Sequence, residues 1–337
     1  MSEQQPTREL TFEFRGTGIE YFKIWIINLL LTIVTLGIYS PWAKVRNNKY
    51  LYNHLYLDDY NFDYHAQPLN ILLGRVIALG VFMILVGIGQ VYPIWGGAIF
   101  FVVILVLAPW IVVSSFSFRN RNSSYKNLRF DFTGDYKGAF ITFGILPLAG
   151  AISFGLLMPL VLRQIRKYVV DNTCYGTSSF EFTAAINDYF MAFLKILGMG
   201  FVLAVGAGVL TTFGAAVPAI AFIGGIAMMA VYLLIYAYYV ATIENLKWNA
   251  SWLRTNYFTS DLKTVELATL FFTNALLMMV TLGLAFPAIK VRVAAYKASR
   301  IVFVACEDLD TFIANEQKQA EAVGQELGEV FDFDLGF

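Results

Sequence analysis

The sequence predicts a polytopic α-helical membrane protein built from three repeats, the third truncated, with short β-strands that form a small cytoplasmic sheet. Three observations support this fold class. The 337 residues are 58% hydrophobic and 14% charged, whereas soluble domains contain about 25% charged residues, and several apolar runs reach the roughly 18 residues of a membrane-spanning helix. A helix-breaking signature occurs three times. Short triplets of aromatic, acidic and aromatic residues recur at matching spacings.

The helix-breaking signature is a glycine, a proline four residues later and a tyrosine nine residues after the proline. The second copy follows the first by 118 residues (155 − 37), and the third follows the second by 128 (283 − 155). Because proline lacks a backbone N–H and fits the first turn of a helix, each copy ends one helix and begins another. The copies are Gly37, Pro41 and Tyr50, then Gly155, Pro159 and Tyr168, then Gly283, Pro287 and Tyr296. We therefore expect three breaker helices, over 19–39, 137–158 and 265–286.

The aromatic and acidic triplets predict short strands with one buried face, because side chains alternate between the two sides of a strand. The spacing within each pair of triplets is 50 residues (62 − 12 and 180 − 130), and the pairs are 118 apart (130 − 12). The four triplets are Phe12-Glu13-Phe14, Phe62-Asp63-Tyr64, Phe130-Asp131-Phe132 and Phe180-Glu181-Phe182. The third repeat is degenerate at both strand positions, 257–259 and 307–309. A fifth triplet at 331–333 is a candidate to fill that vacant place in the sheet.

These spacings divide the chain into repeat one (1–118), repeat two (119–246), a truncated repeat three (247–306) and an acidic C-terminal tail (307–337). A full repeat is expected to run from a strand through an apolar helix, the breaker, a basic helix and a second strand to an apolar helical hairpin. The expected hairpins pair 69–90 with 93–114, and 190–212 with 217–241. Repeat three stops before its hairpin.

The positive charges favour one topology over another. If the three breaker helices cross the membrane, the chain has seven spans and its lysines and arginines divide almost evenly between the two faces. If each breaker helix instead re-enters the face from which it came, all these charges lie on one side, as expected for cytoplasmic loops. We therefore favour four full spans plus three re-entrant helices, with both termini cytoplasmic. Seven spans remain the alternative, because the apolar stretches 139–162 and 267–289 are long enough to cross.

Four stretches of the chain resemble the YjgN-like family of bacterial inner-membrane proteins. They are residues 12–16, residues 28–32, the first breaker with its basic continuation (35–46), and residues 62–65. The resemblance covers nearly the whole chain and implies a multi-pass protein of the bacterial inner membrane. It implies no established activity, ligand, cofactor or catalytic residue.

The sequence contains no motif that is typical of an enzyme. It has no phosphate-binding loop, dinucleotide fingerprint or nucleophile elbow, and no spacing of metal ligands. His54 and His65 are interpreted as interfacial residues, and the two distant cysteines, Cys174 and Cys306, as free thiols. We therefore expect no enzymatic activity, no cofactor, no metal and no nucleic-acid partner.

The three breakers are the best candidates for a functional site. Broken helices leave backbone carbonyl and N–H groups unpaired at membrane depth, and many transporters bind ions or small substrates there. Polar residues recur at equivalent places in repeats one and three (274 − 28 = 246). The predicted cavity for a small polar or ionic ligand is lined by Asn28, Thr35, Gly37, Pro41, Gly155, Pro159, Asn274, Thr281, Gly283 and Pro287. The alternative is that these polar groups only form hydrogen bonds between helices.

Basic residues follow each breaker. We interpret them as contacts to anionic lipid headgroups, with a ring of cations around the mouth of the predicted cavity as the alternative. They are Lys44, Arg46, Lys49, Arg163, Arg166, Lys167, Lys290 and Arg292. Tyr50, Tyr168 and Tyr296 are predicted to be anchors at the membrane interface.

Two functional hypotheses follow. The first is a transporter or channel-like protein with a polar cavity where the broken helices meet. The second is a structural membrane scaffold that binds lipids or a partner protein without transport. Membrane lipids are expected partners in both, whereas the sequence predicts no particular substrate, energy source or oligomeric state.

Overall fold

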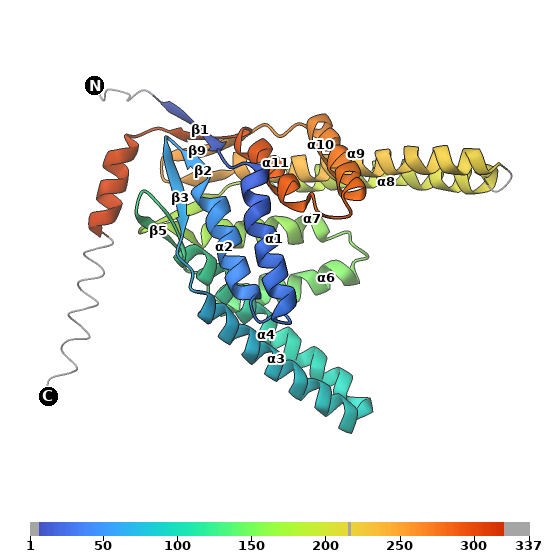
Figure 1. The fold of residues 1–337 in the computed structure, drawn as a ribbon, viewed down its shortest axis with the longest axis horizontal. Helices are drawn as coiled ribbons and strands as arrows, with labels where there is room; N and C mark the ends of the chain where they lie inside the picture. The colour runs from blue at the N-terminus through green and yellow to red at the C-terminus, as the bar shows by residue number, and fades with distance from the viewer. Residues whose placement is uncertain (1–6, 215–216, 320–337) are drawn as a thin grey trace.

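A closed barrel of ten antiparallel strands lies on one side of the molecule in the computed structural model, which describes residues 7–214 and 217–319 (Figure 1). The strands follow one another around the barrel in chain order, and β10 closes it by pairing with both β9 and β1. The strands are β1 Arg8–Phe14, β2 Leu55–Leu57, β3 Tyr60–Tyr64, β4 Ser123–Tyr125, β5 Leu128–Phe132, β6 Thr173–Tyr175, β7 Ser178–Phe182, β8 Ser251–Leu253, β9 Asn256–Ser260 and β10 Ile301–Ala305.

The prediction of a small sheet therefore underestimated the number of strands and did not include their closure into a barrel. The four triplets do form strands β1, β3, β5 and β7, but the barrel needs six more. Four of the missed strands, β2, β4, β6 and β8, have only three residues each, so they show no alternating pattern that a sequence could reveal. The expected strand position at 307–309 was wrong, since the last strand among the described residues is β10, and the tail triplet 331–333 lies outside those residues.

The antiparallel order gives the barrel two different ends. Two-residue turns join β2 to β3, β4 to β5, β6 to β7 and β8 to β9, and they all lie at one end, which we call the turn end. In two of these turns both residues have positive φ, as the right-handed twist of a tight hairpin requires; they are Asp58-Asp59 and Lys126-Asn127. The helices leave and rejoin the barrel at the opposite end, which we call the helix end.

Five helical excursions extend from the helix end. Each consists of two antiparallel arms between consecutive strands (Figure 1). Two are long hairpins, α3 Pro68–Val91 with α4 Pro93–Arg121, and α8 Ile186–Gly214 with α9 Pro218–Asn249. Three contain a breaker: α1 Gly18–Val34 with α2 Ser40–Asn53; α5 Tyr136–Ala139, η1 Phe140–Ile145 and α6 Leu146–Ile152 with α7 Met158–Asp171; and α10 Thr264–Val280 with α11 Phe286–Ala298.

Within the described ranges, four helices are long and apolar enough to cross a membrane: α3, α4, α8 and α9. The shortest of them, α3, has 24 residues, or about 36 Å at 1.5 Å per residue, against a hydrocarbon core of about 30 Å. The breaker helices α1 and α10 have 17 residues each, which gives only about 26 Å. The prediction of four spans is confirmed, whereas the breaker helices are shorter than these four and their re-entry stays a prediction.

The breaker helices end five or six residues earlier than predicted because each finishes in a Schellman motif. In the first turn, the Gly37 N–H donates to the carbonyl of Thr32 (2.8 Å) and the Leu36 N–H to that of Ile33 (3.0 Å). Both Leu36 (φ 51°) and Gly37 (φ 91°) have left-handed backbone, and the second and third turns repeat this geometry. Pro41 then lies in the first turn of α2, where its missing N–H does no harm.

Residues 309–319, at the start of the predicted tail, form a helix that covers the turn end of the barrel. Figure 1 shows this red helix on the side of the barrel away from the α8–α9 hairpin. Leu309, Phe312 and Ile313 belong to the same buried cluster as the inward residues of the strands. The helix therefore forms part of the barrel core.

Candidate functional site

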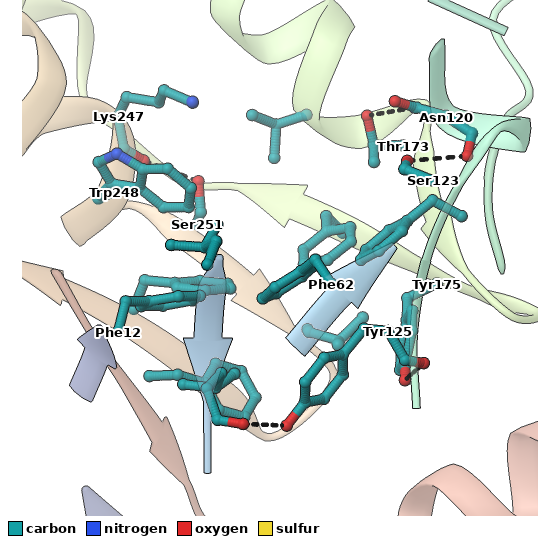
Figure 2. Close-up of a pocket in the computed structure, with 18 of the residues that line it drawn as sticks. Phe12, Phe62, Asn120, Ser123, Tyr125, Thr173, Tyr175, Lys247, Trp248 and Ser251 are labelled. Carbon is teal, nitrogen blue, oxygen red and sulfur yellow. Dashed lines mark hydrogen bonds between the residues drawn. The ribbon is translucent and has the colours of Figure 1, made fainter. Parts of the chain in front are cut away.

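The barrel encloses a cavity of about 370 Å³ with aromatic walls, which we call the chamber. One aromatic residue from each triplet points into it, as does the equivalent residue of β9, because alternate residues of a strand face the same side. These residues are Phe12, Phe62, Phe130, Phe180 and Phe258. Figure 2 shows Phe62 beside Tyr125, with Phe12, Lys247 and Trp248 on one side and Tyr175, Asn120 and Ser123 on the other.

The aromatic rings form a continuous wall. Phe62 lies 4.8 Å from Tyr125 and 6.1 Å from Phe12 between ring centroids, and Phe12 lies 6.5 Å from Phe258. The phenol of Tyr125 donates to the carbonyl of Leu57 (2.8 Å), so its hydroxyl is already satisfied. Burial raises the pKa of Tyr125 above its ordinary value, so the ring is uncharged at physiological pH. The aromatic part of the chamber wall is therefore apolar and neutral.

The turn end of the chamber is closed by the 309–319 helix. Phe312 and Leu309 line the chamber itself. Glu316, which is 1% exposed, fixes the helix to the β6–β7 turn. Its carboxylate accepts hydrogen bonds from the Thr177 N–H (2.7 Å) and hydroxyl (2.8 Å), and from the Ser178 N–H (3.1 Å) and hydroxyl (2.7 Å).

A second contact holds the same helix at the β4–β5 turn. Lys126 Nζ lies 2.7 Å from Asp310 Oδ1 and 3.5 Å from Asp58 Oδ2, and its side chain is only 8% exposed. Gln317 donates to the Lys126 carbonyl (3.0 Å). Two separate polar contacts therefore close the turn end.

The last turns of four excursion helices line the helix end of the chamber. One residue in each lies three positions before the following strand; these residues are Tyr52, Asn120, Val170 and Trp248. The preceding position supplies Arg119 on α4 and Lys247 on α9, which also line the chamber. Neutral polar groups nearby are satisfied within the protein, for example Ser123, which donates to the Asn120 carbonyl (3.0 Å).

Arg119 and Lys247 differ from the other polar groups of the chamber. In the part of the chain that the structure describes, neither lies within 4.0 Å of a carboxylate oxygen. The guanidinium of Arg119 lies 5.0 Å from the centroid of Phe116, and Lys247 Nζ lies 4.2 Å from that of Trp248. The helix end of the chamber, which we call its mouth, therefore carries two cations, and each lies beside an aromatic ring.

None of the three breaker glycines has a close neighbour in the described structure. A Cβ atom built on Gly37, Gly155 or Gly283 would meet nothing within 4 Å. Thr35 accepts from the Tyr39 N–H (3.0 Å), and Thr281 from the Ala285 N–H (3.0 Å), so each hydroxyl caps the helix of its own turn. The prolines of the predicted cavity, Pro41, Pro159 and Pro287, are fully buried in the first turns of α2, α7 and α11.

The two predicted asparagines lie between the arms of their own excursions. Asn28 donates to Asn47 Oδ1 (3.0 Å), and Asn274 accepts from Arg292 (2.7 Å). Both are buried, and Asn28 Oδ1 and Asn274 Nδ2 have no hydrogen-bond partner among the described residues. These contacts match the alternative of hydrogen bonds between helices, apart from the two unpartnered atoms.

The predicted basic residues lie on the second arms of the breaker excursions, and most have partners within the protein. Arg46 donates to the hydroxyl of Tyr39 (3.0 Å) and Arg163 to the carbonyl of Ala184 (2.9 Å). The others are Arg166 with Glu244 at 3.7 Å, Lys167 with Asp171 at 2.6 Å, Arg292 with Asn274, Lys290 over the ring of Phe286, and the exposed Lys44 and Lys49.

The three signature tyrosines share one structural role. Tyr50 accepts from the Thr17 N–H (2.9 Å) and donates to the Thr17 carbonyl (3.0 Å), which ties the second arm to the start of the first. Tyr168 donates to the Asp135 carbonyl (2.7 Å), and Tyr296 bonds the backbone of Lys263 in the same way as Tyr50 bonds Thr17. Their additional role as anchors at the membrane interface stays a prediction.

Arg119 and Lys247 were not among the predicted site residues, because from the sequence alone their charges bear only on the membrane topology. A usable signal existed: each lies four residues before a barrel strand (123 − 119 and 251 − 247), at the end of a membrane-spanning hairpin. That signal has meaning only once the short strands β4 and β8 are known.

Comparisons with known proteins give a family and two distant relatives. The family described as bacterial protein of unknown function (DUF898) matches residues 9–330. The chain is 32% identical over 146 residues to inner membrane protein YjgN of Escherichia coli (strain K12), covering 43% of this chain and 36% of the relative. It is 27% identical over 191 residues to inner membrane protein YjgN of Salmonella typhimurium (strain LT2), covering 56% and 45%. The chain thus spans less than half the length of these curated relatives, and no solved structure matches it.

Proposed function

Since the chain belongs to the DUF898 family of bacterial proteins of unknown function and is an integral inner-membrane protein, we propose that it binds apolar or amphiphilic molecules in the chamber of its barrel. The observation that carries this proposal is the chamber of about 370 Å³ with largely aromatic walls, closed at its turn end and bounded at the other end by helices that continue into the membrane. This is the lipid-binding form of the scaffold hypothesis.

The size and chemistry of the chamber support an apolar guest. Sites for small ligands have volumes of roughly 300–1,000 Å³ and are lined mainly by apolar and aromatic side chains. A water molecule needs two to four polar partners, and the rings of Phe12, Phe62 and Phe130 offer none. Because α4 and α9 lead from the membrane directly to the chamber mouth, the bilayer is the nearest source of an apolar guest.

Filling the chamber mouth tests the proposal. Val169 lines the mouth on α7, and Val169→Trp should occupy the space that the ligand enters. In native mass spectrometry of the detergent-solubilised full chain, we expect wild type to bind one molecule of palmitate or methyl palmitate and Val169→Trp to bind neither. Ile165→Trp, one turn earlier and outside the chamber lining, is the control and should bind as wild type does. Absence of binding of both probes to folded wild type would overturn the proposal.

We also infer that the three breaker turns re-enter the membrane on the side of the barrel, with that side and both termini cytoplasmic. Support comes from the residue before each glycine. Leu36, Phe154 and Leu282 are 94%, 98% and 92% exposed and have φ values of 51°, 53° and 49°. Left-handed backbone disfavours a residue other than glycine by about 1–2 kcal/mol, so a large apolar side chain at this tip needs a reason such as insertion into lipid.

Tryptophan placed at a tip measures this insertion. For Phe154→Trp in liposomes, we expect blue-shifted emission and strong quenching by lipids brominated on the acyl chain. Tyr60→Trp, in β3 beside the β2–β3 turn and 55% exposed, should show neither and serves as the control. Equal quenching of both tryptophans by lipid would contradict the re-entrant arrangement.

A second candidate function is transport through a polar cavity at the breaker turns. Its support is the pair of buried atoms without a partner in the described residues, Asn28 Oδ1 and Asn274 Nδ2. The same tryptophan variants separate the two candidates, because a water-filled cavity at the tip would expose Phe154→Trp to a water-soluble quencher such as iodide. Lipid quenching without iodide quenching favours membrane insertion.

The three-repeat organisation remains our inference. The Schellman turns recur around Gly37, Gly155 and Gly283, and the tyrosine ties recur at Tyr50 and Tyr168 with the sequence offset of 118. The order of strand, breaker excursion and strand pair also recurs along the chain. Duplication explains these coincidences more simply than independent origin.

A further inference from the structure

We infer that the ligand is an anionic amphiphile, whose apolar part occupies the chamber and whose carboxylate or phosphate group lies between Arg119 and Lys247 at the chamber mouth. This inference rests on the proposed function, since it names the chemical class of the molecule bound there. Its basis is the position of the two cations, one on each membrane-spanning hairpin, four residues before the strand that follows.

The surroundings of Lys247 are positively charged. Arg166, Arg119 and Lys297 act on its ammonium group with repulsive electrostatic effects, whereas Glu244 acts on it with an attractive effect. Glu244 also lies 3.7 Å from Arg166, so its negative charge is divided between Arg166 and Lys247. Arg119 and Lys247 themselves line the chamber, and no carboxylate is among its lining residues in the described chain.

A cation removed from water is stable only where it is paired. Lys126, a buried cation at the turn end, obeys this rule, because it is 8% exposed and lies against Asp58 and Asp310. Lys247 is half-buried among the chamber lining, yet within the described residues no carboxylate lies within 4.0 Å of it, nor of Arg119, which is exposed. A bound anion would supply the missing partner, and charge-assisted hydrogen bonds to it are about twice as strong as neutral ones.

The same arrangement disfavours other ligand classes. A cationic amphiphile would meet the excess positive charge of the mouth, and a neutral molecule would leave both cations unpaired while covering them from water. A small inorganic anion would satisfy the cations but leave the aromatic chamber unused. An anion on an apolar body matches both parts of the site, and it has two sources: a membrane phospholipid or a free fatty acid.

Palmitate and methyl palmitate test the charge requirement, because they share one apolar chain and differ only in the anionic group. In native mass spectrometry of the full chain we expect wild type to bind palmitate about 10-fold or more tightly than the ester. Arg119→Gln and Lys247→Gln should each reduce palmitate binding about 10-fold and leave binding of the ester unchanged. Arg121→Gln is the control, since Arg121 lies in the same last turn of α4 but pairs with Asp131 at 2.7 Å.

The outcomes separate the two proposals. Equal binding of acid and ester by wild type, or tighter binding of the ester, overturns this inference and leaves the chamber function standing. Loss of ester binding in the Gln variants to the same extent as palmitate binding also overturns it, because a merely structural role would affect both probes. Failure of wild type to bind either probe removes the chamber function itself.

Competition then identifies the source of the anion. Displacement of palmitate by phosphatidylglycerol but not by phosphatidylethanolamine supports a phospholipid ligand. Displacement by other fatty acids but by neither phospholipid supports a free fatty acid. Displacement by phosphatidylethanolamine as effectively as by phosphatidylglycerol contradicts the requirement for a net negative charge.

Discussion

Replacing Glu316 with alanine will detach the 309–319 helix from the turn end of the barrel. The free energy needed to release this helix should fall by about 2–4 kcal/mol. Glu316 is 1% exposed and its two carboxylate oxygens accept four hydrogen bonds from Thr177 and Ser178. Alanine leaves these donors without partners, and hydrogen bonds to a charged group contribute about 1.5–3 kcal/mol. Because Phe312 and Leu309 line the chamber, the loss also opens its turn end.

Hydrogen exchange measures this release. The amides of Thr177 and Ser178 should exchange faster in Glu316→Ala, together with those of the 309–319 helix. Asn315→Ala on the same helix is the matched control, because Asn315 is exposed and its replacement should leave exchange unchanged. Protection of the Thr177 and Ser178 amides equal to wild type would show that Glu316 does not hold the helix.

The same contact predicts a pH dependence. Burial by itself raises the pKa of Glu316, but hydrogen bonds from Ser178 and Thr177 outweigh it, and the pKa lies below its ordinary value. A carboxyl group whose pKa is lower in the folded state stabilises that state above its unfolded pKa, and this stability is lost as the pH falls through the folded value. We therefore expect exchange at Thr177 and Ser178 to be insensitive to pH near neutrality, after correction for intrinsic rates, and to accelerate below about pH 4.

Gly134→Ala is expected to destabilise the second breaker excursion by about 1–3 kcal/mol through overpacking. A Cβ atom at this position would lie 2.5 Å from Phe132 Cε1 and 2.6 Å from Tyr168 Oη. Tyr168 is buried and its hydroxyl donates to the Asp135 carbonyl at 2.7 Å, so it can move only by breaking the tie between the two arms. The new Cβ atom would also displace the ring of Phe132, which is buried as well.

A double-mutant cycle isolates the contact between Gly134 and Tyr168. Tyr168→Phe removes the hydroxyl that the new methyl group would meet, so Gly134→Ala should cost less in the Tyr168→Phe variant than in wild type. Thermal or denaturant unfolding of the detergent-solubilised chain measures both costs. Gly144→Ala serves as the control, because its nearest neighbours lie 3.8 Å away. Additive effects in the cycle would rule out the proposed clash.

Much of the helical architecture could be predicted from sequence because its signals are local. Membrane-spanning helices such as α3 and α8 need only one continuous apolar run, and Gly37 with Pro41 marks a helix break through backbone chemistry alone. The bounds were less accurate, because the Schellman bonds that end α1 at Val34 depend on hydrogen-bond geometry. The triplets correctly identified four strands, since two aromatic residues around one acidic residue show the period of a strand.

The candidate site could not be predicted in the same way. Phe12 and Phe258 are 246 residues apart in sequence, yet their rings are stacked in the chamber wall with centroids 6.5 Å apart. Arg119 and Lys247 can be recognised as site residues only from their positions just before the short strands β4 and β8, and the sequences of these strands show no alternating pattern. The predicted breaker cavity assumed that equivalent residues such as Gly37 and Gly283 lie together, and it stays a prediction.

The sequence by itself determined that this chain is a membrane protein with four apolar spans, three helix breaks and aromatic strands, because each of these properties follows from a few neighbouring residues. Only the tertiary structure decided that the strands close into a barrel, that their aromatic residues enclose a chamber, and that Glu316 seals one end of it. Closure depends on β10 pairing with both β1 and β9, which is a contact between the two ends of the chain. Such long-range pairing is fixed by the packing of the whole core, and no local pattern encodes it.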